Sequence, residues 1–221
     1  MTRSGFEPVV TVSATYGTGG SVIAPRLSEV LGLPFVDRLI SADMSQDVAR
    51  EEARSASRES LCEGEREIAP AGRFLSYFAR AASVGAMMAP DPIIDDDENI
   101  RVTVEEALRH VAAGEPAVIL GRAGAIALRD RPKTFHVRLD GPVDRRVAWA
   151  AQFEHLDVEA ARQRQAETDK ARTLFVKRLY RVDPADCSLY HLVIDPTVFG
   201  IEPAVEVISL AAGKFFEGSA V

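Results

Sequence analysis

Cysteine is scarce in this chain, and the two that are present, Cys62 and Cys187, lie far apart in the sequence. The chain has no CxxC pair with which a structural zinc site could begin. A disulfide framework or a zinc-stabilised fold is therefore not expected, and reduced thiols in the cytosol are the default interpretation.

Long apolar runs are also missing. The first ten residues, MTRSGFEPVV, lack the apolar stretch of a secretory signal, and no run approaches the length needed to span a bilayer. We expect a soluble cytoplasmic protein without a membrane partner. The formal net charge of −7 argues against a general nucleic-acid binder, because phosphate backbones are held by surplus Lys and Arg.

Familiar hydrolase motifs are absent as well: the chain has neither G-x-S-x-G nor H-E-x-x-H. Its four histidines are scattered, and each is expected to serve packing or to lie at the surface rather than to act in catalysis: His110, His136, His155 and His191.

The chain does contain short β-branched runs that alternate with helical patterns. Strands are predicted at residues 8–13, 33–37, 116–120, 134–139 and 190–195. Helices are predicted from Gly20 to a stop at Gly32, from Pro142 as first helical residue, over about 158–180, and from Pro203 onward. This alternation predicts a single α/β domain over residues 1–221, with a parallel sheet and a helical insertion at about 44–99.

The segment SATYGTGGS, residues 13–21, lies between the first predicted strand and the first predicted helix. The P-loop template is G-x-x-x-x-G-K-[ST], in which backbone N–H groups and a lysine hold phosphates. Here Ala14 takes the place of the first glycine and Gly20 the place of the lysine, while Gly19 and Ser21 match. Taken alone, this half-match is as compatible with a tight structural turn as with a phosphate site.

Four separated blocks resemble the cytidylate kinase-like family of P-loop proteins: TVSATYGTGGSVIAPRLSEVLGLPFVDRLI, VILGRAGAI, HVRLDGPVDRRVAW and AETDKARTLFVKRLYRVDPADCSLYHLVID. Members of that family commonly carry a second glycine in place of the lysine. They usually carry Arg-Glu where this chain has Ala14 and Thr15, and a basic residue at or near Ser21. The loop of this chain therefore has less positive charge than its family pattern.

The resemblance implies a P-loop NTPase-like three-layer fold with a five-stranded parallel sheet, a helical insertion, and a lid at about 158–180. It also implies transfer of a phosphoryl group from ATP, with Mg²⁺, to a small acceptor, most simply a nucleoside monophosphate such as CMP. The residues that it implicates are the following: Gly17, Thr18, Gly19, Gly20 and Ser21 for the donor phosphates, Ser21 also for Mg²⁺, Arg122, Asp169 and Arg172 for catalysis, and Asp37, Arg122, Lys177 and Arg178 for the acceptor.

Several alternatives stay open. Asp37 is equally well read as a helix N-cap, Arg122 could form a structural ion pair, and Lys177 and Arg178 could belong to a solvated helix face. The whole chain could be a nucleotide-binding regulatory or scaffold protein without turnover, because no Lys or Arg occurs from residue 13 to 25. An arginine from the lid, or Arg26, within reach of the loop would argue against that reading. A homodimer through the helical insertion is a further expectation.

Overall fold

The computed structural model describes residues 6–37, 101–102, 104–106, 108–109, 112–113, 115–121 and 123–218. In these residues one parallel sheet of five strands has the order β2-β3-β1-β4-β5. The predicted parallel α/β fold is thereby confirmed, and the strand predicted at 134–139 has the observed bounds. The strands are β1 (Val9–Ala14), β2 (Phe35–Asp37), β3 (Ala117–Leu120), β4 (Thr134–Leu139) and β5 (Leu192–Ile194).

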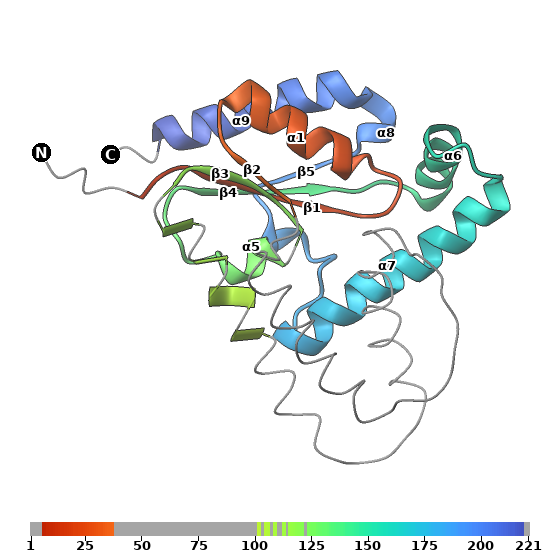
Figure 1. Ribbon diagram of the computed structural model, residues 1–221, viewed down its shortest axis with the longest axis horizontal. Helices are drawn as coiled ribbons and strands as arrows, with labels where there is room; N and C mark the ends of the chain where they lie inside the picture. Colours follow the sequence, from red (N-terminus) through yellow and green to blue (C-terminus); the bar gives the residue numbers. More distant parts are fainter. Residues whose placement is uncertain are drawn as a thin grey trace, which may run out of the picture.

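Helices cover both faces of the sheet. Helices α1 (Gly20–Leu31) and α9 (Ile201–Gly218) lie together on one face, and α5 (Gly124–Ala127) and α7 (Val158–Tyr180) lie on the other (Figure 1). The main apolar core fills the space under α1 and α9, because every second residue of the central strands points there. Its buried members include Val10, Val12, Val137, Leu139 and Ile208.

The opposite face of the central strands is more polar. Thr11, His136 and Arg138 alternate with the core residues of β1 and β4, and each is at least nine-tenths buried. This polar face lies toward α5 and α7, since a Cβ at Gly124 of α5 would meet the side chain of Thr11 at 3.2 Å. The sheet therefore presents hydrogen-bonding groups on the side where the lid helix lies.

Helix boundaries follow local signals with four differences from expectation, the first being that the short helix α5 is not predicted. Gly32 ends α1 in the left-handed conformation, as predicted, with φ of 64°. Pro142 is the residue before α6 (Val143–Phe153) rather than its first residue. Helix α9 begins at Ile201, two residues before Pro203, and an unpredicted short helix, α8 (Pro196–Phe199), precedes it with Asp195 as its N-cap.

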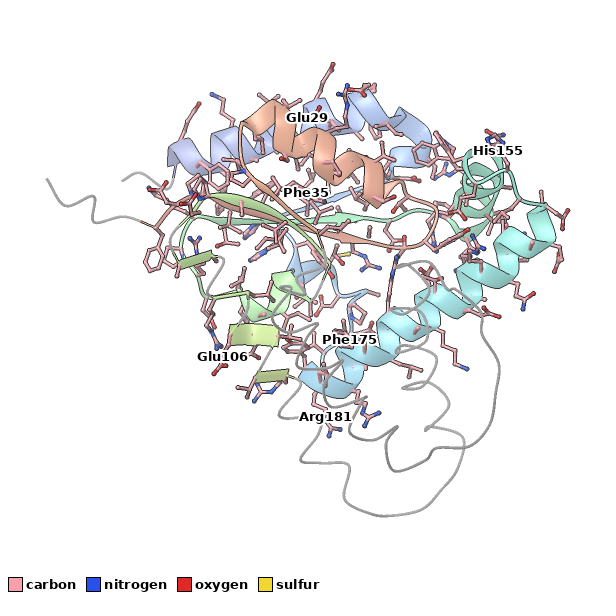
Figure 2. All side chains as sticks on the ribbon, in the orientation of Figure 1. Glu29, Phe35, Glu106, His155, Phe175 and Arg181 are labelled. Carbon is pink, nitrogen blue, oxygen red and sulfur yellow. The ribbon has the colours of Figure 1, made fainter. Side chains whose placement is uncertain are left out.

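Helix α7 has the bounds predicted for the lid. Figure 2 shows His155 in the turn that leads from α6 into α7, and Phe175 and Arg181 near the opposite end. None of the helices in the described ranges is long and apolar enough to cross a bilayer. The predicted insertion at about 44–99 lies outside the described residues.

Candidate functional site

The loop between β1 and α1 presents unpaired backbone N–H groups at a helix start. Gly17 and Gly19 have φ of 79° and 71°, in the left-handed region that favours glycine. The amides of Gly19, Gly20 and Ser21 donate to no acceptor in the described part of the chain, and no side chain caps the helix. Such N–H groups, together with the positive end of the helix dipole, form an anion-binding site.

Gly20 stands where the P-loop template has lysine, and its neighbour explains why. A Cβ at residue 20 would lie 2.5 Å from the Cβ of Ala14, closer than carbon atoms can approach. Ala14 in turn stands where the template has its first glycine. The two departures from the template are therefore linked, because the methyl group of Ala14 occupies the space that the Cβ of any other residue at position 20 would need.

The two hydroxyls in this loop are placed differently. Thr18 is fully buried, and its Oγ1 donates to the carbonyl of Thr15 at 2.8 Å, so it stabilises the turn. Ser21 is exposed in the first turn of α1. A hydroxyl oxygen suits Mg²⁺, which keeps several waters and takes few protein ligands when phosphates also bind it. No cluster of three or more His, Cys, Asp or Glu side chains that could hold a metal ion occurs among the described residues. The assignment of Ser21 to Mg²⁺ stays a prediction.

The lid helix contacts the loop directly through Asp169. Its Oδ1 accepts the backbone N–H of Tyr16 at 2.8 Å, and its Oδ2 lies 2.7 Å from Nη1 of Arg146 on α6. Arg146 is buried, with 5% of its side chain exposed, and also donates to the carbonyls of Tyr16 and Gly141 at 2.7 Å each. A Cβ at Gly17 would lie 2.2 Å from the carbonyl oxygen of Arg146, so α6 packs tightly against the loop.

Arg172 brings positive charge to the loop. Its Nη1 donates to the carbonyl of Ala14 at 2.8 Å. Arg26, the other cation considered from the sequence, instead pairs with Glu29 and Glu202 at 2.8 and 3.2 Å on the exposed side of α1. Helix α7 therefore supplies a guanidinium that contacts the loop at Ala14, the last residue of β1, in addition to Arg146 of α6 at Tyr16.

The remaining cations predicted on the lid lie farther along α7. Lys177 pairs with Asp183 at 2.9 Å, both about half exposed. Lys177 and Arg178 lie in the last turn of α7, more than one helical turn beyond Arg172. Their role toward an acceptor remains a prediction.

A buried charge pair supports the loop from β4. Asp140 follows the last residue of this strand and accepts two hydrogen bonds from Arg138, at 2.9 and 2.7 Å, and one from the Thr15 hydroxyl at 3.1 Å. Burial alone would raise the pKa of Asp140, but the Gly141 amide, Arg138 and Thr15 outweigh it and hold the pKa below its usual value. Asp140 thus stays ionised, and the guanidinium of Arg138 compensates its negative charge.

Asp37, one of the acceptor residues predicted from the sequence, lies at the end of a strand. Asp37 ends β2 and is in register with Leu120, the last residue of β3. Arg122 lies outside the described residues, but Gly121 before it donates its amide to Val12 at 2.8 Å, which fixes the turn to the carboxyl edge of β1. Parallel sheets bind ligands at this edge.

Two residues of the site escape sequence reasoning. Arg146 lies in a block that resembles the family, yet nothing local distinguishes it from Arg145, which pairs with Asp195 at the surface. Tyr16 reads as an ordinary loop aromatic. Their partnership depends on α6 packing over a loop 130 residues earlier, which only the topology reveals.

The model of the Cytidylate kinase-like family matches residues 9–197. The chain belongs to this family. It is 25% identical over 217 residues to a cytidylate kinase from Methanopyrus kandleri (strain AV19), with 95% of each chain covered. It is 24% identical over 197 residues to a cytidylate kinase from Aeropyrum pernix (strain K1), covering 89% of this chain and 94% of the relative.

Among solved structures, this member of the cytidylate kinase-like family shares its fold with an uncharacterized protein from Eubacterium ventriosum ATCC 27560. The TM-score is 0.59 at 17% identity, and the match covers 96% of this chain and 99% of the other. The resemblance drawn from the four sequence blocks is thereby confirmed at the level of family and fold.

Proposed function

We propose that this protein transfers the γ-phosphoryl group of ATP to a small acceptor, and that the acceptor is a nucleoside monophosphate such as CMP. Family membership and two relatives that are named cytidylate kinases support the reaction class. The observation that carries the proposal is the contact of Arg172 with Ala14, because it brings a cation to a loop that has none of its own.

Each part of the loop has a role in this proposal. The free amides of Gly19, Gly20 and Ser21 bind donor phosphate oxygens, and Arg172 turns from the Ala14 carbonyl to the developing charge on the transferred group. Members of the family usually carry an arginine where Ala14 stands, so Arg172 lies at the position whose charge is missing. Ser21 would hold Mg²⁺, which would supply positive charge to neutralise the donor phosphates.

The acceptor in this proposal binds at the neighbouring strand ends. Asp37 is the last residue of β2, and Arg122 comes two positions after the end of β3 in the sequence. A guanidinium at residue 122 can bind a monophosphate through two parallel hydrogen bonds. Phosphoryl transfer then needs alignment and charge stabilisation more than covalent chemistry. The second function, nucleotide binding without turnover, is favoured by the absence of Lys and Arg from residue 13 to 25.

The test is ADP release from Mg·ATP with a panel of nucleoside monophosphates, nucleosides and small alcohols. We expect turnover with one acceptor class and a fall in kcat of about 10²- to 10³-fold in Arg172→Ala, the usual effect of removing one transition-state donor. Arg122→Ala should raise the KM of the acceptor. Lys170→Ala is the matched control, since Lys170 is an exposed cation on the same helix.

Two outcomes would contradict the kinase. One is the absence of ADP release with every acceptor while ADP still raises the melting temperature, which identifies a binding protein without turnover. The other is equal activity of Arg172→Ala and Lys170→Ala, which would remove the residue on which the proposed mechanism depends.

A further inference from the structure

We propose that Asp169 and Arg146 are positioning residues that latch the lid helix to the phosphate-binding loop, so that donor affinity depends on docking of α7. This inference rests on the proposed function for its kinetic consequences. In this proposal Asp169 holds the backbone of the loop, whereas the sequence analysis predicts a catalytic role for it. The proposal also includes Arg146, which the sequence analysis does not single out.

The latch holds both backbone polar groups of one residue. The Tyr16 N–H donates to Asp169 Oδ1 at 2.8 Å, and the Tyr16 carbonyl accepts from Arg146 Nη1 at 2.7 Å. The same Nη1 lies 2.7 Å from Asp169 Oδ2, which closes a three-membered network among the loop, α6 and α7. Gln165, one turn before Asp169, donates to Oδ2 at 2.9 Å and fixes the carboxylate further.

The network is desolvated, so each of its members depends on the others. The side chains of Arg146 and Asp169 are 5% and 18% exposed. Removing Arg146 leaves the Asp169 carboxylate without its arginine partner, and removing Asp169 leaves Arg146 with the Asp140 carboxylate alone, 3.8 Å from its Nε. Loss of one partner of a buried pair costs more than the pair itself contributes. Docking of α7 and the conformation of Tyr16 are therefore coupled and do not vary independently.

The side chain of Tyr16 extends the same connection. Its hydroxyl donates to Glu154 Oε2 at 2.8 Å, and Glu154 pairs with Arg164 of α7 at 2.7 Å. Burial and the neighbouring Glu154 raise the pKa of Tyr16 to about 12, which keeps the phenol a neutral donor. Two points on α7, Arg164 and Asp169, thus converge on one loop residue.

Tyr16 directly precedes the left-handed glycine at residue 17, from which the amides of the anion site follow. A shift of Tyr16 turns that glycine and with it the amide directions toward the phosphates. Coupling of this kind is reciprocal, so donor binding should stabilise the docked lid to the same extent that docking favours donor binding.

The first test needs no turnover. In ligand-free protein, hydrogen exchange is measured at the Tyr16 amide and across residues 161–176 for the parent chain, Asp169→Ala and Arg146→Met. We expect faster exchange by at least tenfold at Tyr16 and a parallel increase in α7 for both variants. Glu167→Gln is the control, because Glu167 is exposed on α7 and bonds Gln163 at 2.9 Å. Unchanged exchange at Tyr16 in Asp169→Ala would overturn the latch.

The second test separates positioning from catalysis. Pyrophosphate is the probe, and we expect Asp169→Ala to weaken its binding by about tenfold and to raise the KM of ATP with the acceptor KM unchanged. A loss of kcat or of acceptor binding at unaltered pyrophosphate affinity would instead make Asp169 a catalytic or acceptor residue. The double variant Arg146→Met/Asp169→Asn removes both charges and leaves neither of them buried alone. It can therefore be measured if a single variant fails to fold. It should bind pyrophosphate as weakly as Asp169→Ala.

The two proposals fail separately. If no acceptor is phosphorylated, the proposed function falls, while the exchange measurement still decides the latch. If the latch is absent but turnover occurs, Asp169 and Arg146 are ordinary structural partners and the kinase stands.

Discussion

Ala14 and Gly20 lie against each other where β1 ends and α1 begins. The space for a side chain at residue 20 is closed by a methyl group 2.5 Å away, so the identity of one residue restricts the other. The absence of the lysine is therefore explained by packing. Ala14 at the end of β1 has a side chain, and residue 20 at the start of α1 has room only for glycine. The groups proposed to bind phosphate are backbone amides, which any substitution at residue 20 except proline retains.

This packing predicts a strong coupling in a double-mutant cycle. Gly20→Ala alone should lower the free energy of unfolding by about 1–3 kcal/mol, the usual cost of overpacking. Ala14→Gly in the same chain removes the opposing methyl group, and Gly20→Ala should then be neutral or stabilising. Urea unfolding of both single variants and the double variant gives the coupling energy. Additivity within about 0.5 kcal/mol would show that the two side chains do not compete for the space.

At the scale of elements, sequence patterns located the secondary structure well where one signal dominated. Gly32 marked the end of α1, and the polar run from Val158 to Tyr180 marked α7. Helix α8 is not predicted, although the Asp195–Pro196 pair is an N-cap followed by a proline at the first helical position, and the predicted start of α9 is two residues late. These signals are local, so the sequence alone carries enough information to predict α8.

Contacts between elements could not be predicted in the same way. Candidate residues Gly17 to Ser21 and Arg172 were found because the family pattern marks them. The partners of Asp169 were not, since Tyr16 is 153 residues away in sequence and Arg146 is 23. Such contacts depend on how α6 and α7 cross the carboxyl edge of the sheet, and no local periodicity encodes that crossing.

Helix α7 carries Asp169 and Arg172, which both contact the loop. The stability of its first turn should therefore affect these contacts. Asp157 caps the helix through its Oδ2, which accepts from the amides of Glu159 and Ala160 at 3.1 and 3.4 Å. Asp157→Ala should cost about 1 kcal/mol and speed amide exchange in the first turn of α7. Asp157→Asn keeps the cap and should restore exchange close to that of the parent chain. Equal exchange in the alanine and asparagine variants would show that the cap contributes nothing.

For the whole molecule, the polar face of the sheet links stability to pH. His136 in β4 is 4% exposed, and its Nδ1 lies 2.7 Å from the Thr11 hydroxyl. Its Nε2 is buried and has no hydrogen-bond partner among the residues that the structure describes. Burial, and then the neighbouring His191, lower the pKa of His136 to about 4. It lines a cavity of about 360 Å³ whose other charged or titratable residues are Arg129, Asp130, Asp186 and His191.

The folded protein therefore binds fewer protons at His136 than the unfolded chain does between pH 6.5 and about 4. The contribution is complete above pH 6.5 and is lost as the pH falls through this window, because protonation favours the unfolded chain. The difference between the two pKa values corresponds to about 3 kcal/mol. The free energy of unfolding should fall across this window in both proteins. The decrease should be smaller in His136→Gln than in the parent chain, by about 3 kcal/mol. Urea titrations at pH 7, 5.5 and 4 measure it, with His155→Gln, a change in the exposed turn before α7, as the control. Parallel curves for the parent chain and His136→Gln would mean that the imidazole is protonated equally in the folded and unfolded states.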